Sequence, residues 1–110
     1  MRETFRIIWA EAAVQDFESI LEYIAFHDCY EAAATVHEKL LGRIDTLVHT
    51  PMRCRYVPEL KEIGLTEYRE LIVRPYRICF RIHGHDVVLV SILDGRRDLE
   101  QILMDRAMQR

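Results

Sequence analysis

An alternating segment followed by a nearly continuous apolar run constrains the fold of this chain more than any other feature. From Tyr76 to Ile82, apolar and polar residues alternate, as in a strand that buries one face. The apolar set is Tyr76, Ile78, Phe80 and Ile82, and the opposite set is Arg77, Cys79, Arg81 and His83. Residues 83–86 provide a turn, because Gly84 can adopt positive φ. Val87 to Leu93 is apolar almost throughout, which predicts a central strand covered on both faces.

Further strands are predicted on either side of this pair. The run from Tyr68 to Val73 ends before Pro75, which cannot donate a ladder hydrogen bond. Near the N-terminus, alternation over residues 5–9 predicts a strand of the same sheet, because its apolar residues must bury one side. Residues 53–57 fit either a short edge strand or a loop.

Two helices are predicted between the first strand and the rest of the sheet. The first begins at Glu11, and its apolar face consists of Ala13, Phe17, Ile20, Leu21 and Ile24. The second runs from Tyr30 to His49 and is closed by Pro51; its apolar stripe consists of Ala33, Val36, Leu40, Ile44 and Leu47. The break between the two helices is short, which predicts an antiparallel helical hairpin.

Helix caps are predicted at two positions. Asp28 precedes the second helix, and Glu31 stands three positions later, as in a capping box. Asp98 is placed in the same way before a short C-terminal helix, with Gln101 in the reciprocal position. A helix of that length needs docking or a partner to be stable.

These elements predict one α+β domain over residues 1–110. Its N-terminal strand and helical hairpin pack with a mainly antiparallel sheet of four to five strands, and a short C-terminal helix follows. No apolar run approaches the roughly 20 residues that a membrane span needs. The three cysteines are odd in number and widely spaced, which favours reduced thiols in a cytoplasmic protein. We expect no cofactor and no metal, because nothing nearby completes a ligand set around His83 and His85.

The net charge of −3 conceals an asymmetry along the chain. Residues 10–50 contain eight acidic and two basic side chains, whereas residues 51–98 contain nine basic and seven acidic ones. The acidic excess is explained most simply as the solvated surface of the two helices. Thirteen of the fifteen cations are arginines, which favour bidentate contacts with carboxylates or phosphates. The net negative charge disfavours indiscriminate nucleic-acid binding, whereas the local excess of arginines permits a focused anionic partner.

Three arginines are predicted to converge near one end of the sheet. Arg77 projects from the polar face of its strand, and Arg96 and Arg97 follow the next strand directly. Such a group can bind a phosphate or a carboxylate. The alternative is a purely structural role, in which the arginines pair with acidic residues of the chain itself. The candidate partners are Glu70, Asp94 and Asp98.

Three segments carry a family resemblance: Tyr-Arg-Glu-Leu at 68–71, Pro-Tyr-Arg-Ile at 75–78, and Ile-Leu-Asp-Gly-Arg-Arg-Asp-Leu at 92–99. Together they resemble the C-terminal half of the RelE/ParE toxin superfamily, and the likeness extends more loosely to the two helices. Asp94 departs from the pattern, since many relatives have His before Gly-Arg-Arg. The resemblance implies the toxin of a bacterial type II toxin–antitoxin (plasmid stabilisation) module. Such a toxin is neutralised by a cognate antitoxin in a hetero-oligomer.

The resemblance also bears on enzymatic activity. Arg77 and Arg97 match arginines that contact the RNA phosphate in RelE-type, ribosome-dependent endoribonucleases, so they would be catalytic in a RelE-like protein. Those enzymes have a second basic residue where this chain has Leu71, and a late tyrosine that is missing after Tyr76. Arginine is a poor general base, which would leave His83 or a neighbouring histidine for that role. The pattern therefore favours a ParE-like protein that binds and inhibits DNA gyrase.

Candidate contact residues follow from the resemblance and the arginine pattern together. The predicted target- or phosphate-binding residues are Arg69, Arg77, Arg81, Arg96 and Arg97. The predicted antitoxin-binding residues are Arg77, Arg96, Leu99, Ile102 and Leu103. Two alternatives stay open: a RelE-like endoribonuclease that acts on ribosome-bound mRNA with an altered site, and a degenerate relative that only binds its antitoxin.

Overall fold

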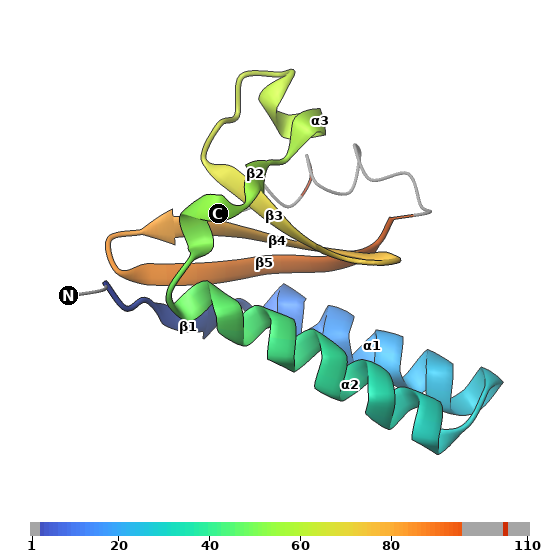
Figure 1. Ribbon diagram of the computed structural model, residues 1–110. Helices are drawn as coiled ribbons and strands as arrows, with labels where there is room; N and C mark the ends of the chain where they lie inside the picture. The colour runs from blue at the N-terminus through green and yellow to red at the C-terminus, as the bar shows by residue number, and fades with distance from the viewer. Residues whose placement is uncertain (1–2, 96–104, 106–110) are drawn as a thin grey trace.

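The computed structural model describes residues 3–95 and residue 105, and it has an α+β fold in which a helical hairpin covers one face of a five-stranded sheet (Figure 1). The elements are β1 (Arg6–Trp9), α1 (Glu11–His27), α2 (Tyr30–Asp45), η1 (Thr46–Val48), η2 (Pro51–Arg53), β2 (Arg55–Tyr56), α3 (Pro58–Lys61), β3 (Tyr68–Val73), β4 (Tyr76–His83) and β5 (Asp86–Asp94). The predicted fold class is confirmed.

The sheet has the strand order β1-β5-β4-β3-β2. Strand β1 pairs with β5 in parallel, and the other neighbours are antiparallel, so the sheet is mixed but mainly antiparallel. The N-terminal strand therefore joins the same sheet, as predicted. Strand β5 lies between β1 and β4, which confirms that residues 87–93 form an interior strand. The alternatives for residues 53–57 are resolved, because a two-residue strand forms there at the edge.

The helix-facing side of the sheet carries the main hydrophobic core. Residues from β3, β4 and β5 pack there against the hairpin, and Ile78, Phe80 and Leu89 are fully buried. The buried members of this core are Phe5, Ala13, Leu40, Ile44, Leu47, Leu71, Val73, Ile78, Phe80, Val87, Leu89 and Ile92. Tyr76 and Ile82 pack against its margin, so the predicted alternation of β4 is confirmed. We call this surface the helix side.

Part of the opposite face of the sheet is covered by α3 and its flanking loops (Figure 1). A smaller core forms beneath them from Val57, Leu60, Tyr68, Cys79 and Leu93. Cys79 and Tyr68 are thus packed inside the protein rather than presented to a ligand. Because Arg77 also projects to this face, we call it the arginine side.

A bulge in β5 lets one strand serve both cores. Cys79 of β4 is opposite Ser91, whereas its neighbour Phe80 is opposite Leu89, so β5 contains one extra residue. As a result, the helix-side positions of β5 are three residues apart, at Leu89 and Ile92, instead of two. Strand β1 pairs with β5 only as far as Leu89, so Ile92 lies beyond it. There the Asp16 carboxylate of α1 accepts a hydrogen bond from the Ile92 N–H at 3.0 Å. A helix side chain thereby satisfies a backbone donor that no longer has a strand beside it.

The end and the cap of α2 differ from the sequence expectation. The α-helix ends at Asp45 and continues as a 3-10 turn, whereas we predicted a helix to His49. Its N-cap is Cys29, whose Sγ accepts from the Ala32 N–H at 3.4 Å, and not Asp28. Asp28 instead closes α1, because its own N–H donates to the Ile24 carbonyl.

Two further expectations concern helices. The predicted C-terminal helix with its Asp98 cap and Gln101 lies outside the described residues. Within the described part of the chain, no helix is both long and apolar enough to cross a membrane.

Candidate binding site

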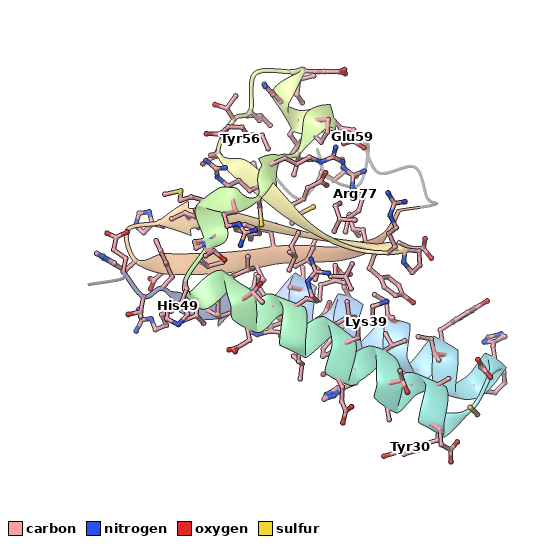
Figure 2. The ribbon with its side chains drawn as sticks, in the orientation of Figure 1. Tyr30, Lys39, His49, Tyr56, Glu59 and Arg77 are labelled. Atoms are coloured by element: carbon pink, nitrogen blue, oxygen red, sulfur yellow. The ribbon has the colours of Figure 1, made fainter. Side chains whose placement is uncertain are left out.

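Arg77 is the centre of a network of charges on the arginine side of the sheet (Figure 2). Its two terminal nitrogens donate to the two carboxylate oxygens of Glu59, at 2.6 and 2.7 Å. Its Nε donates to Oε1 of Glu70 at 2.7 Å. The Arg77 side chain is only 13% exposed. The guanidinium fork is therefore occupied by two internal carboxylates.

Glu70 extends the network towards the sheet edge. Its side chain is completely buried, and its other carboxylate oxygen accepts from Arg55 Nε at 2.6 Å. We call the chain of residues Arg55, Glu70, Arg77 and Glu59 the four-charge network. The sequence analysis gave Glu70 as a possible internal partner of Arg77, and the structure contains this pair. It did not predict Glu59 as the second partner.

The network shifts the ionisation of its members. The hydrogen bond from Arg77 lowers the pKa of Glu59 despite its partial burial. The hydrogen bonds to Glu59 and Glu70 raise the pKa of Arg77 further above its usual value, although burial opposes this. Both effects favour the charged forms. The described residues leave no buried side-chain nitrogen or oxygen without a hydrogen-bond partner.

Local structure explains how Glu59 reaches Arg77. Pro58 occupies the first turn of α3, where its missing N–H has no intrahelical partner to lose. Val57 and Leu60, on either side, are buried in the smaller core. Packing of these two residues holds the short helix over β4 and turns Glu59 towards the guanidinium. Glu59 is eighteen positions from Arg77 and lies in a segment without regular hydrophobic periodicity. No sequence pattern therefore predicts that the two residues meet.

Two open clefts lie beside the network. The larger, of about 580 Å³, is lined by Arg55, Ile72, Arg74, Pro75, Tyr76, Arg77 and Gly95. The smaller, of about 400 Å³, is lined by Arg43, Thr46, Leu47, Thr50, Arg53, Cys54, Arg55, Glu70, Leu71 and Ile72. The clefts share Arg55 and Ile72, and together they gather five arginines: Arg43, Arg53, Arg55, Arg74 and Arg77.

The clefts follow an open edge of the sheet. Strand β2 pairs only with Arg69 and Glu70 of β3. Within residues 3–95, the rest of β3, from Leu71 to Val73, has no strand on that side. An unpaired edge presents backbone donors and acceptors that an incoming strand can use. The surface therefore offers both cations and backbone hydrogen bonds to a partner.

Gly95 forms one wall of the larger cleft and brings the end of β5 beside Arg77. Its N–H donates to the Pro75 carbonyl at 2.7 Å. A Cβ at this position would lie 3.0 Å from the same oxygen and 3.6 Å from Cδ of Arg77. This close approach explains the glycine without any requirement for positive φ.

The remaining predicted contact residues are dispersed. Arg69 projects to the helix side, where it donates to the carbonyls of Met52 and Cys54 and stacks over the Tyr56 ring at 4.3 Å. Arg81 lies on the arginine side opposite Tyr68 and is half-buried. The other candidates lie outside the described residues: Arg96, Arg97, Leu99, Ile102 and Leu103. Sequence reasoning missed Arg43, Arg53, Arg55 and Arg74. The basic excess of residues 51–98 was the only signal for the last three, and Arg43 lies in the acidic segment 10–50, which gave none.

The two turn histidines lie far from the network. His83 ends β4, six residues from Arg77, which corresponds to roughly 20 Å along a strand. His85 faces Glu3, with its Nε2 3.6 Å from the carboxylate. Cys54 lines the smaller cleft, but burial raises the pKa of its thiol and so disfavours a reactive thiolate. The described residues contain no group of three His, Cys, Asp or Glu placed to hold a metal.

Comparison with known proteins gives a consistent set of similarities. The family described as "ParE toxin of type II toxin-antitoxin system, parDE" matches residues 7–99. The fold is similar to a structure of the chromosomal ParDE system from P. aeruginosa, with a TM-score of 0.70 and 16% identity, covering 84% of this chain and 97% of the other. It is also similar to the RelBE2 toxin–antitoxin complex from Mycobacterium tuberculosis, with a TM-score of 0.56 and 19% identity, covering 83% and 91%. No curated protein sequence matches significantly.

Proposed function

Since the chain belongs to the ParE toxin family of type II toxin–antitoxin systems, we propose that it arrests bacterial growth by binding and inhibiting DNA gyrase, and not by cutting RNA. The observation that carries this proposal is the occupied fork of Arg77. Its terminal nitrogens bind the Glu59 carboxylate and its Nε binds Glu70, and the Arg77 side chain is nearly buried. A phosphate would have to displace a carboxylate that already matches the guanidinium.

Within residues 3–95, the two carboxylates beside Arg77 are held by its guanidinium, and no histidine lies near enough to serve as a free general base. RNA cleavage by 2′-hydroxyl attack needs a base for the nucleophile and an acid for the leaving oxygen. Leu71, which replaces a basic residue of the catalytic relatives, is buried on the helix side and so faces away from Arg77. His83 is roughly 20 Å away along β4. Binding, unlike cleavage, needs neither group.

A cognate antitoxin is the second partner that we propose. Besides Arg77, whose fork is occupied, the two clefts place four arginines along the open edge of β3, which suits an acidic segment that adds a strand to the sheet. We keep Arg77 and Arg96 as proposed antitoxin contacts, together with Leu99, Ile102 and Leu103. The two solved structures named above both come from toxin–antitoxin systems, which agrees with such a partner.

The target is tested by two parallel assays on the purified chain. One measures supercoiling by DNA gyrase, and the other measures mRNA cleavage on translating ribosomes. We expect inhibition in the first, no codon-positioned cuts in the second, and reversal of the inhibition by the antitoxin. Charge reversal at Arg96 or Arg97 should weaken the inhibition without producing any cleavage. Ribosomal cleavage with normal supercoiling would refute the gyrase proposal and would assign Arg77 and Arg97 as catalytic phosphate ligands.

The antitoxin site is tested by charge reversal at exposed cleft residues. Arg53→Glu and Arg74→Glu should each weaken antitoxin binding at least about tenfold, because each replaces an attraction by a repulsion. Arg6→Glu is the matched control, since Arg6 lies on β1, at the other edge of the sheet. Isothermal titration measures the affinities. Equal affinities for all three variants would show that the antitoxin does not use these clefts.

A further inference from the structure

The far end of the α1–α2 hairpin exposes a cluster of aromatic side chains. Phe26 is 86% exposed, and Tyr23 and Tyr30 are also mostly exposed. The rings of Tyr23 and Phe26 flank His27, with centroid distances of 4.0 and 5.0 Å. Figure 1 shows the hairpin continuing past the ends of the strands, and Figure 2 places Tyr30 at its far end. We call this region the hairpin tip.

A groove between the two helices adjoins these aromatics. Its volume is about 360 Å³, and its lining is Leu21, Glu22, Ala25, Tyr30, Ala33, Ala34 and His37. Small side chains leave room for an apolar side chain of a partner, and Glu22 supplies a carboxylate beside it. Every residue from 25 to 31 is exposed, so the sheet does not cover the tip. Contiguous exposed aromatics beside a groove are typical of protein interaction sites.

The charge of this region is one-sided. Between Ile7 and Glu38 the chain has no Lys or Arg. Of its acidic residues, Glu22 lines the groove and Asp28 and Glu31 lie in the exposed segment at the tip. A second copy of the chain would bring like charges together at the tip. A basic segment would meet complementary charge around an apolar centre. The antitoxin segment proposed for the arginine clefts has the opposite character.

From this combination we infer that the hairpin tip binds a basic, amphipathic segment of the toxin's protein target. An apolar side chain of that segment fills the groove between Leu21, Ala25 and Ala33, and its Lys or Arg residues meet the surrounding carboxylates. The identity of the target rests on the proposed function, whereas the chemistry of the surface does not.

The chemistry is tested with synthetic peptides and the full chain. A labelled amphipathic Leu/Lys peptide is titrated by fluorescence anisotropy against the wild type, Phe26→Ser and Tyr30→Ser, and an isomeric Leu/Glu peptide serves as the charge control. Ile63→Ser is the matched variant, because Ile63 is an exposed apolar residue outside the hairpin. We expect the tip variants to lose at least about tenfold in affinity and the Ile63 variant to lose none. Equal binding to all variants, or binding of the acidic peptide, would overturn the inference.

The role of the tip is tested with gyrase and the antitoxin. If the wild type inhibits gyrase, Phe26→Ser should inhibit at least about tenfold less while it binds the antitoxin as before. Equal inhibition would remove the tip from target binding and leave the proposed function intact. No inhibition by the wild type would refute the proposed target, and the peptide titration would then judge the tip alone. Loss of antitoxin binding, or of a wild-type dimer, in the tip variants would assign another occupant and overturn the inference.

Discussion

The two faces of the sheet are built from alternate residues of the same strands, yet they are stabilised in different ways. On the helix side, β4 contributes Ile78 and Phe80 to a continuous apolar core beneath the hairpin. On the arginine side, the same strand contributes Cys79 to a smaller core and Arg77 to a network of four charges. Burial of apolar surface is non-directional, whereas each ion pair needs particular atoms at particular distances.

The two faces therefore differ in how they respond to substitution: the helix side mainly affects stability, and the arginine side also affects the surface that we propose for binding. The helix side can exchange one apolar residue for another of similar volume at modest cost. The arginine side depends on exact partners, since an uncompensated buried charge is far more costly than a methyl-sized void. It also carries the larger cleft, which runs beside the open edge of β3. The surface that we propose for antitoxin binding therefore lies where local structure depends most on charge pairing.

The largest effect is expected on the helix side. Phe80→Ala should lower the free energy of unfolding by about 4 kcal/mol, because it removes a fully buried ring and leaves a cavity. Urea denaturation with an unchanged m-value measures the loss. Phe26→Ala at the exposed hairpin tip is the control and should change stability by less than about 0.5 kcal/mol. A loss at Phe80 below about 1 kcal/mol would show that the helix-side core collapses around the gap.

The next effect concerns the centre of the arginine side. Glu70→Gln should destabilise the protein by about 3 kcal/mol, because it leaves the nearly buried Arg77 with one carboxylate instead of two. Replacing the pair together, as Glu70→Leu with Arg77→Met, should restore part of this stability. The charges that this leaves unpaired are Glu59 and Arg55, whose side chains are 28% and 63% exposed. Urea denaturation of both variants makes the comparison. If the double variant were the less stable one, the ion pair would be a net source of stability.

A smaller, pH-dependent effect is expected at Glu59. The hydrogen bond from Arg77 lowers the pKa of Glu59 below its usual value of 4.5 in the folded state. The stabilisation is therefore fully present above pH 4.5 and is lost as the pH falls through the folded-state pKa. Thermal unfolding should show a steeper loss of stability with acid in the wild type than in Glu59→Gln. Parallel acid profiles would contradict a stabilising role for the Glu59 carboxylate.

The smallest effect is expected at the outer end of the network. Arg55→Ala should cost about 0–1 kcal/mol, because the Arg55 side chain is 63% exposed and Glu70 keeps its contact with Arg77. The same urea series measures it. A loss as large as that of Glu70→Gln would mean that Glu70 depends on Arg55 for its charge, and the network would then have to be treated as one cooperative unit.

Much of the architecture was predictable because its signals are periodic. Alternation in residues 76–82 and helical spacing after Glu11 assign each residue to a face without reference to distant contacts. The three segments that resemble RelE/ParE toxins agree with the family match over residues 7–99. The candidate site was less predictable. Arg77 was singled out correctly as a side chain of the polar face, but not as a residue whose fork is filled by Glu59.

The failures have a common cause in aperiodic sequence. The β5 bulge lies within a run that is apolar throughout, so the sequence contains no change of phase to reveal it. The cap of α2 went to Cys29 and not to Asp28, because the preceding helix uses the Asp28 backbone for its own last turn.

By itself, the sequence determined the class of fold, the buried faces of the two hairpin helices and of β4, and the family, because each of these depends on local period or on short contiguous motifs. Tertiary structure alone decided which charges meet. The four-charge network joins residues of β2, α3, β3 and β4, and the arginine clefts also draw on α2 and η2. Electrostatic pairing depends on separations of a few ångströms between side chains that are distant in sequence. Only the packing of α3 over the sheet brings Glu59 within that range of Arg77.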